Sequence, residues 1–548
     1  MKLTKHDIGG ELISIITKGM YTDPKDALRE YIQNGVDALA KNLIIKIKHN
    51  TIIVSDDGHG MDKVIMRKAI RVGISEKNPK KSVGFMGIGL YSSFHLCDRL
   101  TIYSKVENES PNRMIFHFEN MRANLEHQKY LRLNEKSKNK PEQIDLQTLL
   151  ENNIEFHNLK EASFPKVGTR VEMEGLESNF FKSLSKEVEL TEYLERVIPL
   201  PFSPDFTYGN QIQKHIEAIC KKHNSPFRTV NLTLEINGNE QPLFRPYRDA
   251  DFRDKAHPDD KPLAPKYYEL IGNDGFLGLA WGCLNSGRRN IPNPKVRGFI
   301  VKKQGFTIGK REDLVSHYGR LVYFNRYVGE FIVVHPKLLP NGPRSDFEYS
   351  MIRTTFYGIL QEVATKYNRV ADEYQEQEKA LSDIAEAIDT YNEIQAQVEF
   401  FSSNGDKLLE FFQDLNIIQI NLSKKLAADK IRKESKKDAE DIIRRIKTLL
   451  SEIKSYLEIK KSKNKKKANS LSSINKLVKP IPKKGSEPLA DNLTQIIELF
   501  GLEINDDLKS IFELIDDMFI KSQSNSKEEY NKKLAELKRD IETLFETE

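Results

Sequence analysis

The sequence predicts an α+β protein of several domains, and three observations lead to this fold class. Residues 1–185 mix helical patterns with short β-branched runs, whereas residues 186–350 alternate strand candidates with Gly, Asn and Pro turns. Beyond residue 350, Gly and Pro become scarce and helical periodicity dominates. A chain of 548 residues is also too long for one hydrophobic core. We therefore expect two α+β domains, 1–185 and 186–350, followed by an all-α region.

The first region contains the clearest short-range signals. Residues 44–49 and 51–55 are β-branched and predict a strand pair that turns at Asn50, with helices at 25–41 and 62–72. Residues 107–165 are polar and irregular and read as an insertion, with an exposed loop at 135–141. In the second region the strand candidates are 230–236, 276–281, 296–302 and 320–325.

The third region divides by composition. We expect helices over 351–458, broken at 402–405, then a lysine-rich linker over 459–488, and two C-terminal helices over 489–548. The long helix over 351–398 is expected to hold a dimer or to present a partner surface. A helix stack within one subunit is the alternative.

Composition limits the compartment and the partners. The 85 Lys and Arg nearly balance the 80 Asp and Glu, so the formal charge of +5 does not itself indicate nucleic-acid binding. Cys97, Cys220 and Cys283 lie too far apart for a metal-ligand or disulfide pattern. No run reaches the roughly 18 apolar residues of a membrane-spanning helix, and the N-terminus has no signal-peptide pattern. We expect a soluble cytoplasmic protein without a membrane partner.

The first motif lies in LREYIQNGVDALAK, residues 28–41. On a helix its polar residues share one narrow arc, and the apolar ones face the other way. The polar set is Glu30, Asn34, Asp37 and Lys41; the apolar set is Leu28, Ile32, Gly35 and Leu39. An amide oxygen beside carboxylates suits Mg²⁺, and a carboxylate can deprotonate an attacking water. A solvated helix face would show the same pattern.

Three further motifs follow in the chain. At 52–61 an apolar strand runs into Asp56-x-Gly58-x-Gly60, where a carboxylate can accept a hydrogen bond from an exocyclic amine; a plain Asp-Gly turn is the alternative. At 84–94 glycines precede a helix and can hold phosphates, beneath a flap or ordinary loop at 73–82. At 168–173 Gly-Thr enters a strand, which means little on its own.

Together and in this order, the four motifs resemble the ATP-binding motifs of the GHKL ATPase superfamily. That superfamily contains gyrase-type topoisomerases, the 90-kDa heat-shock chaperone, histidine kinases and MutL. LREYIQNGVDALAK, DDGHGM, GFMGIGLYSSF and GTRVEM are most similar to the heat-shock chaperone and its microrchidia relatives. The resemblance implies an ATP hydrolase that uses Mg²⁺, with a Bergerat α/β sandwich in which helices cover a mixed sheet.

The resemblance also implies the role of each motif residue. Glu30 would be the general base, Asn34 would coordinate Mg²⁺, and Asp56 would hold the adenine amino group with Thr169 supporting it through water. The implied ATP-binding set is Asn34, Asp37, Lys41, Asp56, Gly58, Gly60, Met61, Ser75, Gly84, Phe85, Met86, Gly87, Ile88, Gly89, Leu90 and Thr169.

For residues 186–350 the resemblance implies a transducer domain with a ribosomal-protein-like fold, which sends a basic residue to the γ-phosphate. Arg344, in LLPNGPRSDF, is similar to the chaperone's catalytic arginine, although a surface arginine is the alternative. Lys302 and Lys303 are the other candidates, by analogy with the lysine of topoisomerases and MutL.

Two functions fit these expectations. The first is a chaperone-like, nucleotide-gated homodimer that clamps an unidentified protein client or effector. The second is an ATPase switch in a nucleic-acid-associated system, such as a microrchidia-like clamp or a bacterial antiviral defence module. Only the lysines of 460–484 favour the second, and a solvated linker is the simpler explanation of them. Salt-dependent DNA binding that is lost on removing 460–484 would separate the two.

Overall fold

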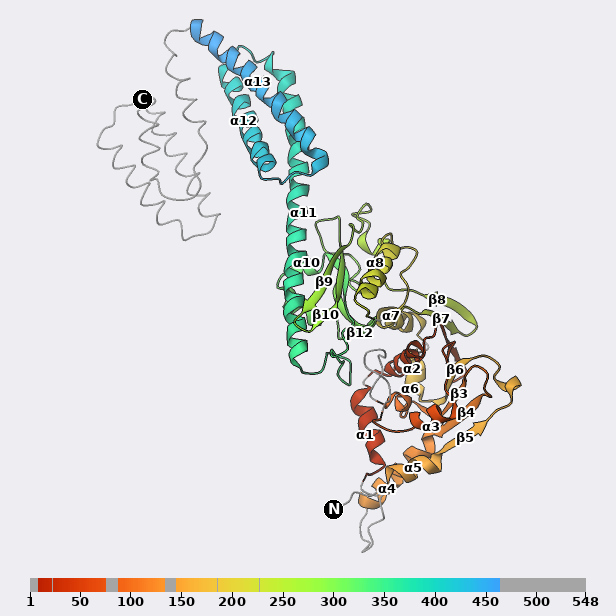
Figure 1. The fold of residues 1–548 in the computed structure, drawn as a ribbon. Helices are drawn as coiled ribbons and strands as arrows, with labels where there is room; N and C mark the ends of the chain where they lie inside the picture. Colours follow the sequence, from red (N-terminus) through yellow and green to blue (C-terminus); the bar gives the residue numbers. More distant parts are fainter. Residues whose placement is uncertain are drawn as a thin grey trace. The chain divides into compact units, whose positions relative to one another are not determined.

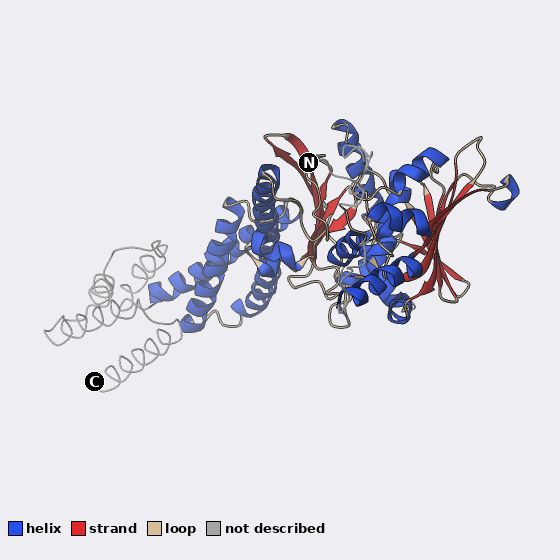
Figure 2. Cartoon of the chain, turned by 90° about the horizontal axis from the view of Figure 1, so that it is seen from below, coloured by secondary structure: helices blue, strands red, loops and turns tan. Residues whose placement is uncertain are grey.

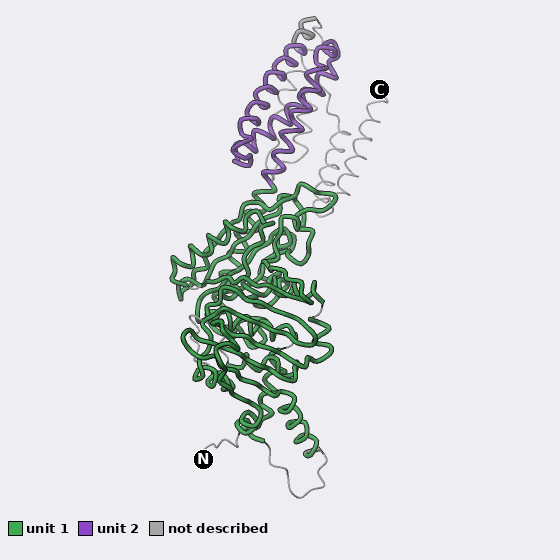
Figure 3. The backbone as a smooth tube through the Cα atoms, turned by 90° about the vertical axis from the view of Figure 1, so that its right-hand side faces the viewer, with its two compact units in different colours: residues 1–375 green, residues 376–548 purple. Residues whose placement is uncertain are grey.

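A computed structural model describes residues 8–21, 23–74, 87–133, 144–184, 186–225 and 227–463. Several expectations lie outside these residues: Ser75, Gly84, Phe85 and Met86, the loop at 135–141, most of the lysine-rich linker and both C-terminal helices. The chain divides into two compact units, Met1–Gln375 and Glu376–Glu548 (Figure 3).

An eight-stranded sheet forms the first layer of unit 1, in the order β5-β4-β3-β6-β2-β1-β7-β8. Its strands are β1 (Asn42–Lys48), β2 (Thr51–Asp56), β3 (Cys97–Lys105), β4 (Asn112–His117), β5 (Ile154–Asn158), β6 (Gly168–Leu176), β7 (Asn231–Ile236) and β8 (Asn239–Leu243). The expected strand pair is confirmed, since β1 and β2 are antiparallel and meet at Lys48 and Thr51. Positive φ angles at His49 and Asn50 fit the tight turn between them.

Helices cover one face of this sheet, and this confirms the expected mixed sheet with a helical layer (Figure 2). They are α1 (Glu11–Met20), α2 (Asp26–Asp37), α3 (Lys63–Ala69), α4 (Phe118–Leu133), α5 (Leu146–Asn153), α6 (Ser178–Leu184) and α7 (Glu187–Val197). Helix α2 begins with an acidic residue, Asp26, as helix N-termini favour. Its Leu28 and Ile32 are fully buried in the same core as Ile45 of β1.

The expectation of an irregular insertion at 107–165 is wrong. This region supplies β4 and β5 to the sheet and adds α4 and α5, although its loop at 135–141 is not described. Few apolar residues suffice because they are spaced to face inward: Met114 and Phe116 on β4, and Met121 on α4, are fully buried.

The sheet continues past the domain boundary expected at residue 185. Strand β7 pairs in parallel with β1, from Asn42 opposite Asn231 to Ile47 opposite Ile236, and β8 pairs with β7. The apolar side chains Leu232 and Leu234 of β7 are buried in the first core. The first sheet therefore takes its last two strands from residues 231–243.

A second sheet in unit 1 has the order β12-β11-β13-β10-β9. Its strands are β9 (Lys266–Gly272), β10 (Gly275–Leu284), β11 (Gly298–Lys303), β12 (Phe306–Ile308) and β13 (Tyr327–Val333). Helices α8 (Gly209–Lys222) and α11 (Met351–Val398) cover its opposite faces (Figure 1). Alternation along β10 divides the two cores, since Trp281 packs with α8 and Ala280 with α11.

The strand expected at 320–325 is wrong, because the chain there forms the short helix α10 (Leu321–Phe324), which follows α9 (Val315–Tyr318). Gly319 takes a left-handed φ of 70° that ends α9. Leu321 and Val322 are 51% and 67% exposed, so their apolar character does not serve a sheet. The strand begins only at Tyr327.

Unit 2 is helical within its described residues, as expected. The last part of α11 packs with α12 (Gly405–Ala427) and α13 (Lys436–Lys463) around one core that contains Ile384, Leu415 and Ile446. The break expected at 402–405 is the loop before α12, where the Asn404 side chain accepts a hydrogen bond from the Lys407 amide. Among the residues with assigned positions, no helix is long and apolar enough to cross a membrane. All three cysteines are buried as free thiols.

Candidate active site

A cavity of about 430 Å³ lies between the helical layer and the first sheet, and the four motifs meet in it. It also reaches the loop that carries Arg344. The expected residues that line it are Glu30, Asn34, Asp37, Asp56, Gly60, Met61, Gly87, Ile88, Gly89, Leu90, Thr169 and Arg344. Lys41, Gly58, Lys302 and Lys303 are described but do not line it.

Helix α2 supplies Glu30, Asn34 and Asp37 to the cavity wall. The helix is shorter than the expected 25–41, because Ala38 ends it and Leu39 takes a φ of 64°. Lys41 therefore does not share their arc; its backbone amide donates to Asp57 Oδ1 at 2.7 Å. Leu39, expected to face a core, is 54% exposed for the same reason.

Asp56 stands where β2 ends, next to α2. A Cβ atom on Gly35 of α2 would lie 3.1 Å from the Asp56 Cβ, so the helix approaches the strand end closely. Burial raises the pKa of Asp56 to about 6, and hydrogen bonds from the backbone of Gly58 and Thr169 partly offset that rise. Gly58 N donates to Asp56 Oδ1 at 2.9 Å, which explains why Gly58 supports the carboxylate from outside the cavity.

Two glycines allow backbone segments to pass close together around the end of β2. Gly60 has a φ of 72°, and a Cβ there would lie 2.0 Å from the carbonyl oxygen of Lys105. Gly168 has a φ of 132°, and its Cβ would lie 2.1 Å from the carbonyl oxygen of Asp56. Only glycine fits both conformations, which accounts for the two motifs that end β2 and begin β6.

Ser104 on β3 is a site residue that the sequence analysis missed. Its Oγ lies 2.9 Å from Thr169 Oγ1 and accepts a hydrogen bond of 2.8 Å from the Met61 amide. It is fully buried at a position that alternates with Leu100 and Ile102. The sequence feature that could have identified it is a polar residue at an inward-facing position of an apolar strand. Ser104 thus holds together two of the motifs that line the cavity.

The glycine-rich loop brings its backbone against α2. A Cβ on Gly89 would lie 3.0 Å from Glu30 Oε2 and 3.8 Å from Asn34 Nδ2, so glycine leaves that space open. The helix expected after the glycines is only a 3₁₀ turn, Gly89–Tyr91, because the following residues form turns and then β3. The open space beside Glu30 and Asn34 can admit phosphate oxygens and a small cation.

Arg344 reaches Glu30 from the second domain of unit 1. Its Nη2 and Nε atoms donate to Glu30 Oε1 at 2.8 and 3.1 Å, and each side chain is only 11% exposed. Tyr21 lines the cavity beside them; burial raises its pKa, and the Glu30 carboxylate adds to that rise. The pair therefore joins residues 314 positions apart within one cavity.

Lys302 and Lys303 are held elsewhere. Lys302 Nζ donates to the carbonyl of Arg196 at 2.9 Å and lies 3.6 Å from Glu330 Oε1, whereas Lys303 Nζ donates to the carbonyl of His335. Every residue of β11 is buried, and neither side chain lines the cavity. Burial lowers the pKa of Lys302 to about 8 and that of Lys303 to about 7.

The donor set fits Mg²⁺ in the manner expected of a nucleotide site. Mg²⁺ usually takes one or two protein oxygens, phosphate oxygens and water, and the Asn34 amide beside Glu30 offers such a place. Within the described part of the chain, no group of three or more His, Cys, Asp or Glu could form a closed metal cage. Lys68 and Arg71 also line the cavity, and their role was not predicted.

Comparisons with known proteins agree with this geometry. The family described as "Histidine kinase-, DNA gyrase B-, and HSP90-like ATPase" matches residues 21–150. Chaperone protein HtpG of Polaromonas sp. (strain JS666 / ATCC BAA-500) is 25% identical, over 17% of this chain and 20% of its own. Heat shock protein 75 kDa, mitochondrial, of Bos taurus is 26% identical, over 19% of each chain.

The chain thus spans about a fifth of the length of the curated relatives it matches. The match contains three of the four motifs, and it supports ATP binding and hydrolysis by this part of the chain. Residues 21–150 are therefore a GHKL-type ATPase domain, and their similarity to these two relatives supports a place in the HSP90 branch of that superfamily.

Proposed function

We propose that this chain binds Mg²⁺–ATP in the cavity described above, hydrolyses it, and uses the cycle to drive a chaperone-like dimeric clamp. One observation carries the proposal: a carboxylate suited to act as base, Glu30, meets an arginine from the second domain, Arg344, in the cavity that also contains Asp56. Asp56 at one end of the cavity can bind the purine of ATP. The pair of Glu30 and Arg344 at the other end can meet its phosphates.

At the adenine end, Asp56 accepts a hydrogen bond from the exocyclic amine. Its Oδ1 already accepts from Gly58, which leaves the remaining acceptor capacity of the carboxylate for the base. Met61, Ile102 and Val171 line the cavity and supply apolar walls for the purine ring. Thr169, held by Ser104, supports the same edge through water.

At the phosphate end, the water oxygen bonds to the γ-phosphorus while the bond to the ADP oxygen breaks, and Glu30 accepts the proton of that water. Asn34 and the phosphate oxygens would hold Mg²⁺, which would offset part of the phosphate charge. Arg344 exchanges its bonds to Glu30 for bonds to γ-phosphate oxygens, which frees the base and stabilises the transition-state charge.

Replacing Arg344 by alanine tests this assignment. We expect kcat for ATP to fall by about 10²-fold or more, as when a transition-state cation is removed, with nucleotide affinity within about threefold of wild type. The measurements are steady-state turnover and binding of a fluorescent nucleotide. The matched control is Arg320→Ala, which removes a 60%-exposed arginine of the same domain that pairs with Asp372. Wild-type turnover in Arg344→Ala would rule out its catalytic role.

The clamp part of the proposal rests on the relatives, one of which is named a chaperone and the other a heat-shock protein. We expect the Glu30→Ala protein, which would retain ATP, to become dimeric or to tighten its dimer with ATP but not with ADP. Mass measured by analytical ultracentrifugation with each nucleotide gives the answer. A single mass that does not change with nucleotide would contradict a nucleotide-gated clamp and leave the ATPase assignment intact.

A further inference from the structure

Arg344 projects from a short loop whose shape is fixed by its own hydrogen bonds. Arg344 N donates to the Asn341 carbonyl at 3.0 Å, and Asn341 N donates to the Asp346 carbonyl at 2.8 Å. Ser345 N donates to the Asn341 side chain at 3.0 Å. Arg344 itself takes a φ of 55°, a left-handed conformation that non-glycine residues adopt at a cost of about 1 kcal/mol. Surrounding contacts must hold the loop in this shape.

The strongest of these contacts come from helix α11. The Asp346 carboxylate accepts hydrogen bonds from Arg353 Nε at 3.2 Å, from Arg353 Nη2, and from Tyr357 Oη at 2.6 Å. Arg353 and Tyr357 are four positions apart and so lie on one face of α11. We call Asp346, Arg353 and Tyr357 the clasp. Burial, the Asp346 hydrogen bond and the Asp346 charge raise the pKa of Tyr357, so the phenol keeps its proton.

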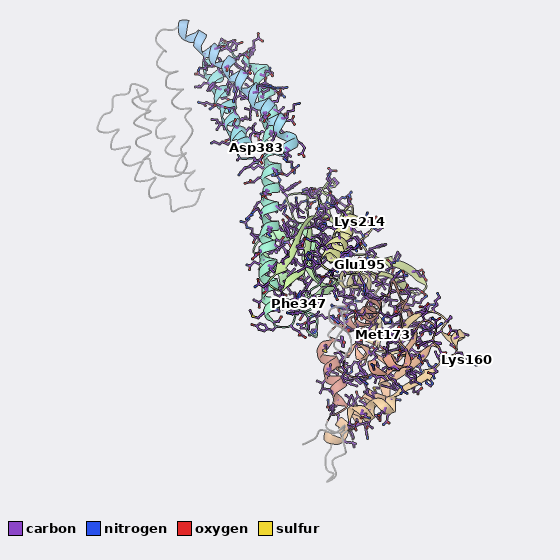
Figure 4. The ribbon with its side chains drawn as sticks, in the orientation of Figure 1. Lys160, Met173, Glu195, Lys214, Phe347 and Asp383 are labelled. Atoms are coloured by element: carbon purple, nitrogen blue, oxygen red, sulfur yellow. The ribbon has the colours of Figure 1, made fainter. Side chains whose placement is uncertain are left out.

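An apolar contact fixes the same end of the loop. Phe347 is 3% exposed, and its ring lies 5.5 Å from that of Phe356 in an edge-to-face arrangement. Figure 4 labels Phe347 beside the first turns of α11. Since Phe356 lies between the two clasp residues in sequence, polar and apolar contacts bind one short stretch of helix to the loop.

The far side of the loop is tied to the active-site helix. Gly309 N donates to the Arg344 carbonyl at 3.0 Å, and Arg29 Nη2, next to Glu30 on α2, donates to the carbonyl of Thr307 on β12 at 2.6 Å. Arg344 is therefore fixed through its main chain on one side and through the clasp on the other. Its reach toward Glu30 depends on both.

We propose that Asp346 is a positioning residue for ATP hydrolysis, which acts by holding the Arg344 loop against α11 through Arg353 and Tyr357. The inference rests on the proposed role of Arg344 and extends it to three residues that do not line the cavity. Without the carboxylate, the loop loses its charge-assisted bonds to the helix, and Arg344 is free to relax from its left-handed conformation. A displacement of about 1 Å of a positioning group can cost about 10²-fold in rate.

The chain offers a closely matched control for this clasp. Asp372, also on α11, accepts hydrogen bonds from an arginine and a tyrosine, Arg320 and Tyr323, in the same domain. It therefore repeats the chemistry of Asp346 away from the loop. Asp372→Ala removes an equivalent set of bonds without touching Arg344.

The experiment measures kcat, nucleotide Kd and amide hydrogen exchange for Asp346→Ala, Asp346→Asn, Tyr357→Phe and Asp372→Ala. We expect Asp346→Ala to lower kcat about tenfold with Kd within about twofold, and to speed exchange of the Gly309 and Arg344 amides. Asp346→Asn keeps the shape of the side chain, so its kcat should fall less than that of Asp346→Ala. It replaces the alanine variant in the test if that variant does not fold. The kcat and the amide exchange rates of Tyr357→Phe should lie between those of wild type and of Asp346→Ala. Asp372→Ala should match wild type in all three measurements.

A double-mutant cycle with Arg344→Ala decides between positioning and a general structural role. If Asp346 acts through Arg344, adding Asp346→Ala to Arg344→Ala lowers kcat no further. Equal losses in both backgrounds, or a wild-type kcat in Asp346→Ala, would overturn the inference. If Arg344→Ala alone turns over like wild type, the proposed catalytic role of Arg344 fails instead, and the exchange rates still report whether the clasp holds the loop.

Discussion

Glu30→Ala is expected to abolish ATP turnover almost completely while leaving nucleotide bound. Loss of a general base costs about 10²–10⁴-fold in rate. Removing this carboxylate also removes a negative charge from the phosphate end of the cavity and leaves Arg344 without the partner it now contacts at 2.8 Å. Because the γ-phosphate can replace that partner, we expect the variant to favour ATP over ADP more strongly than wild type does. Single-turnover hydrolysis and competition binding measure the two effects.

Two variants make this result specific. Glu30→Gln keeps the side-chain shape but is not basic, so it should be as slow as Glu30→Ala. Glu126→Ala changes an exposed glutamate on α4 of the same domain and should leave turnover and binding unchanged. Substantial turnover by both Glu30 variants would mean that another group activates the water.

Asp56→Asn is expected to prevent nucleotide binding at ordinary concentrations. Gly58 N donates to Asp56 Oδ1, so the asparagine oxygen would take that position and its NH₂ group would face the adenine amine, donor against donor. The loss of a charge-assisted hydrogen bond with an unpaired buried donor costs about 3 kcal/mol or more, roughly 100-fold in affinity. Calorimetric titration with ATP measures it. Asp57→Asn is the control, because Asp57 lies next in sequence and does not line the cavity. Wild-type affinity in Asp56→Asn would exclude this carboxylate as the adenine acceptor.

The same carboxylate gives binding a pH dependence. Burial raises the pKa of Asp56 to about 6, so in the free protein it protonates as the pH falls through that value. Protonation replaces the acceptor by a hydroxyl group, and nucleotide affinity should therefore decline below about pH 6.

The contribution of Asp56 to folding stability changes with pH in the opposite direction to its contribution to nucleotide affinity. The folded pKa lies above the ordinary aspartate value of 3.8, so ionisation of this carboxylate destabilises the fold as pH rises from about 4 to 6.

Most residues that line the cavity could be predicted from the sequence because they belong to short local motifs. Asp56 had to end a strand, and Gly60 and Gly168 occupy backbone conformations that admit no side chain, so their motifs record the geometry directly. The meeting of Arg344 with Glu30 depends on how two sheets pack, and only the resemblance of LLPNGPRSDF to the chaperone's arginine loop pointed to it. Lys302 and Lys303 lie outside the cavity because every residue of β11 is buried, which short alternating runs do not reveal.

Boundaries were harder to predict than motifs. The α2 helix ends before Lys41 because Leu39 takes a left-handed conformation, in a turn where Ala40 N donates to the carbonyl of Gly35. An apolar residue such as leucine does not predict a left-handed turn. Residues 107–165 looked irregular because polar residues outnumber the few inward-facing ones. Strands β7 and β8 could not be assigned to the first sheet because β7 joins it through β1, which lies almost 190 positions earlier in the chain, and β8 joins it only through β7.

The pairing of β7 with β1 limits how this protein can be divided. A fragment that stopped at residue 185 would expose the unpaired edge of β1, a strand with three inward-facing apolar side chains, Leu43, Ile45 and Ile47. Such an edge is a template for association with other chains. We therefore expect a fragment cut where the ATP-binding motifs end to associate with itself, and a fragment that extends through residue 243 to avoid this.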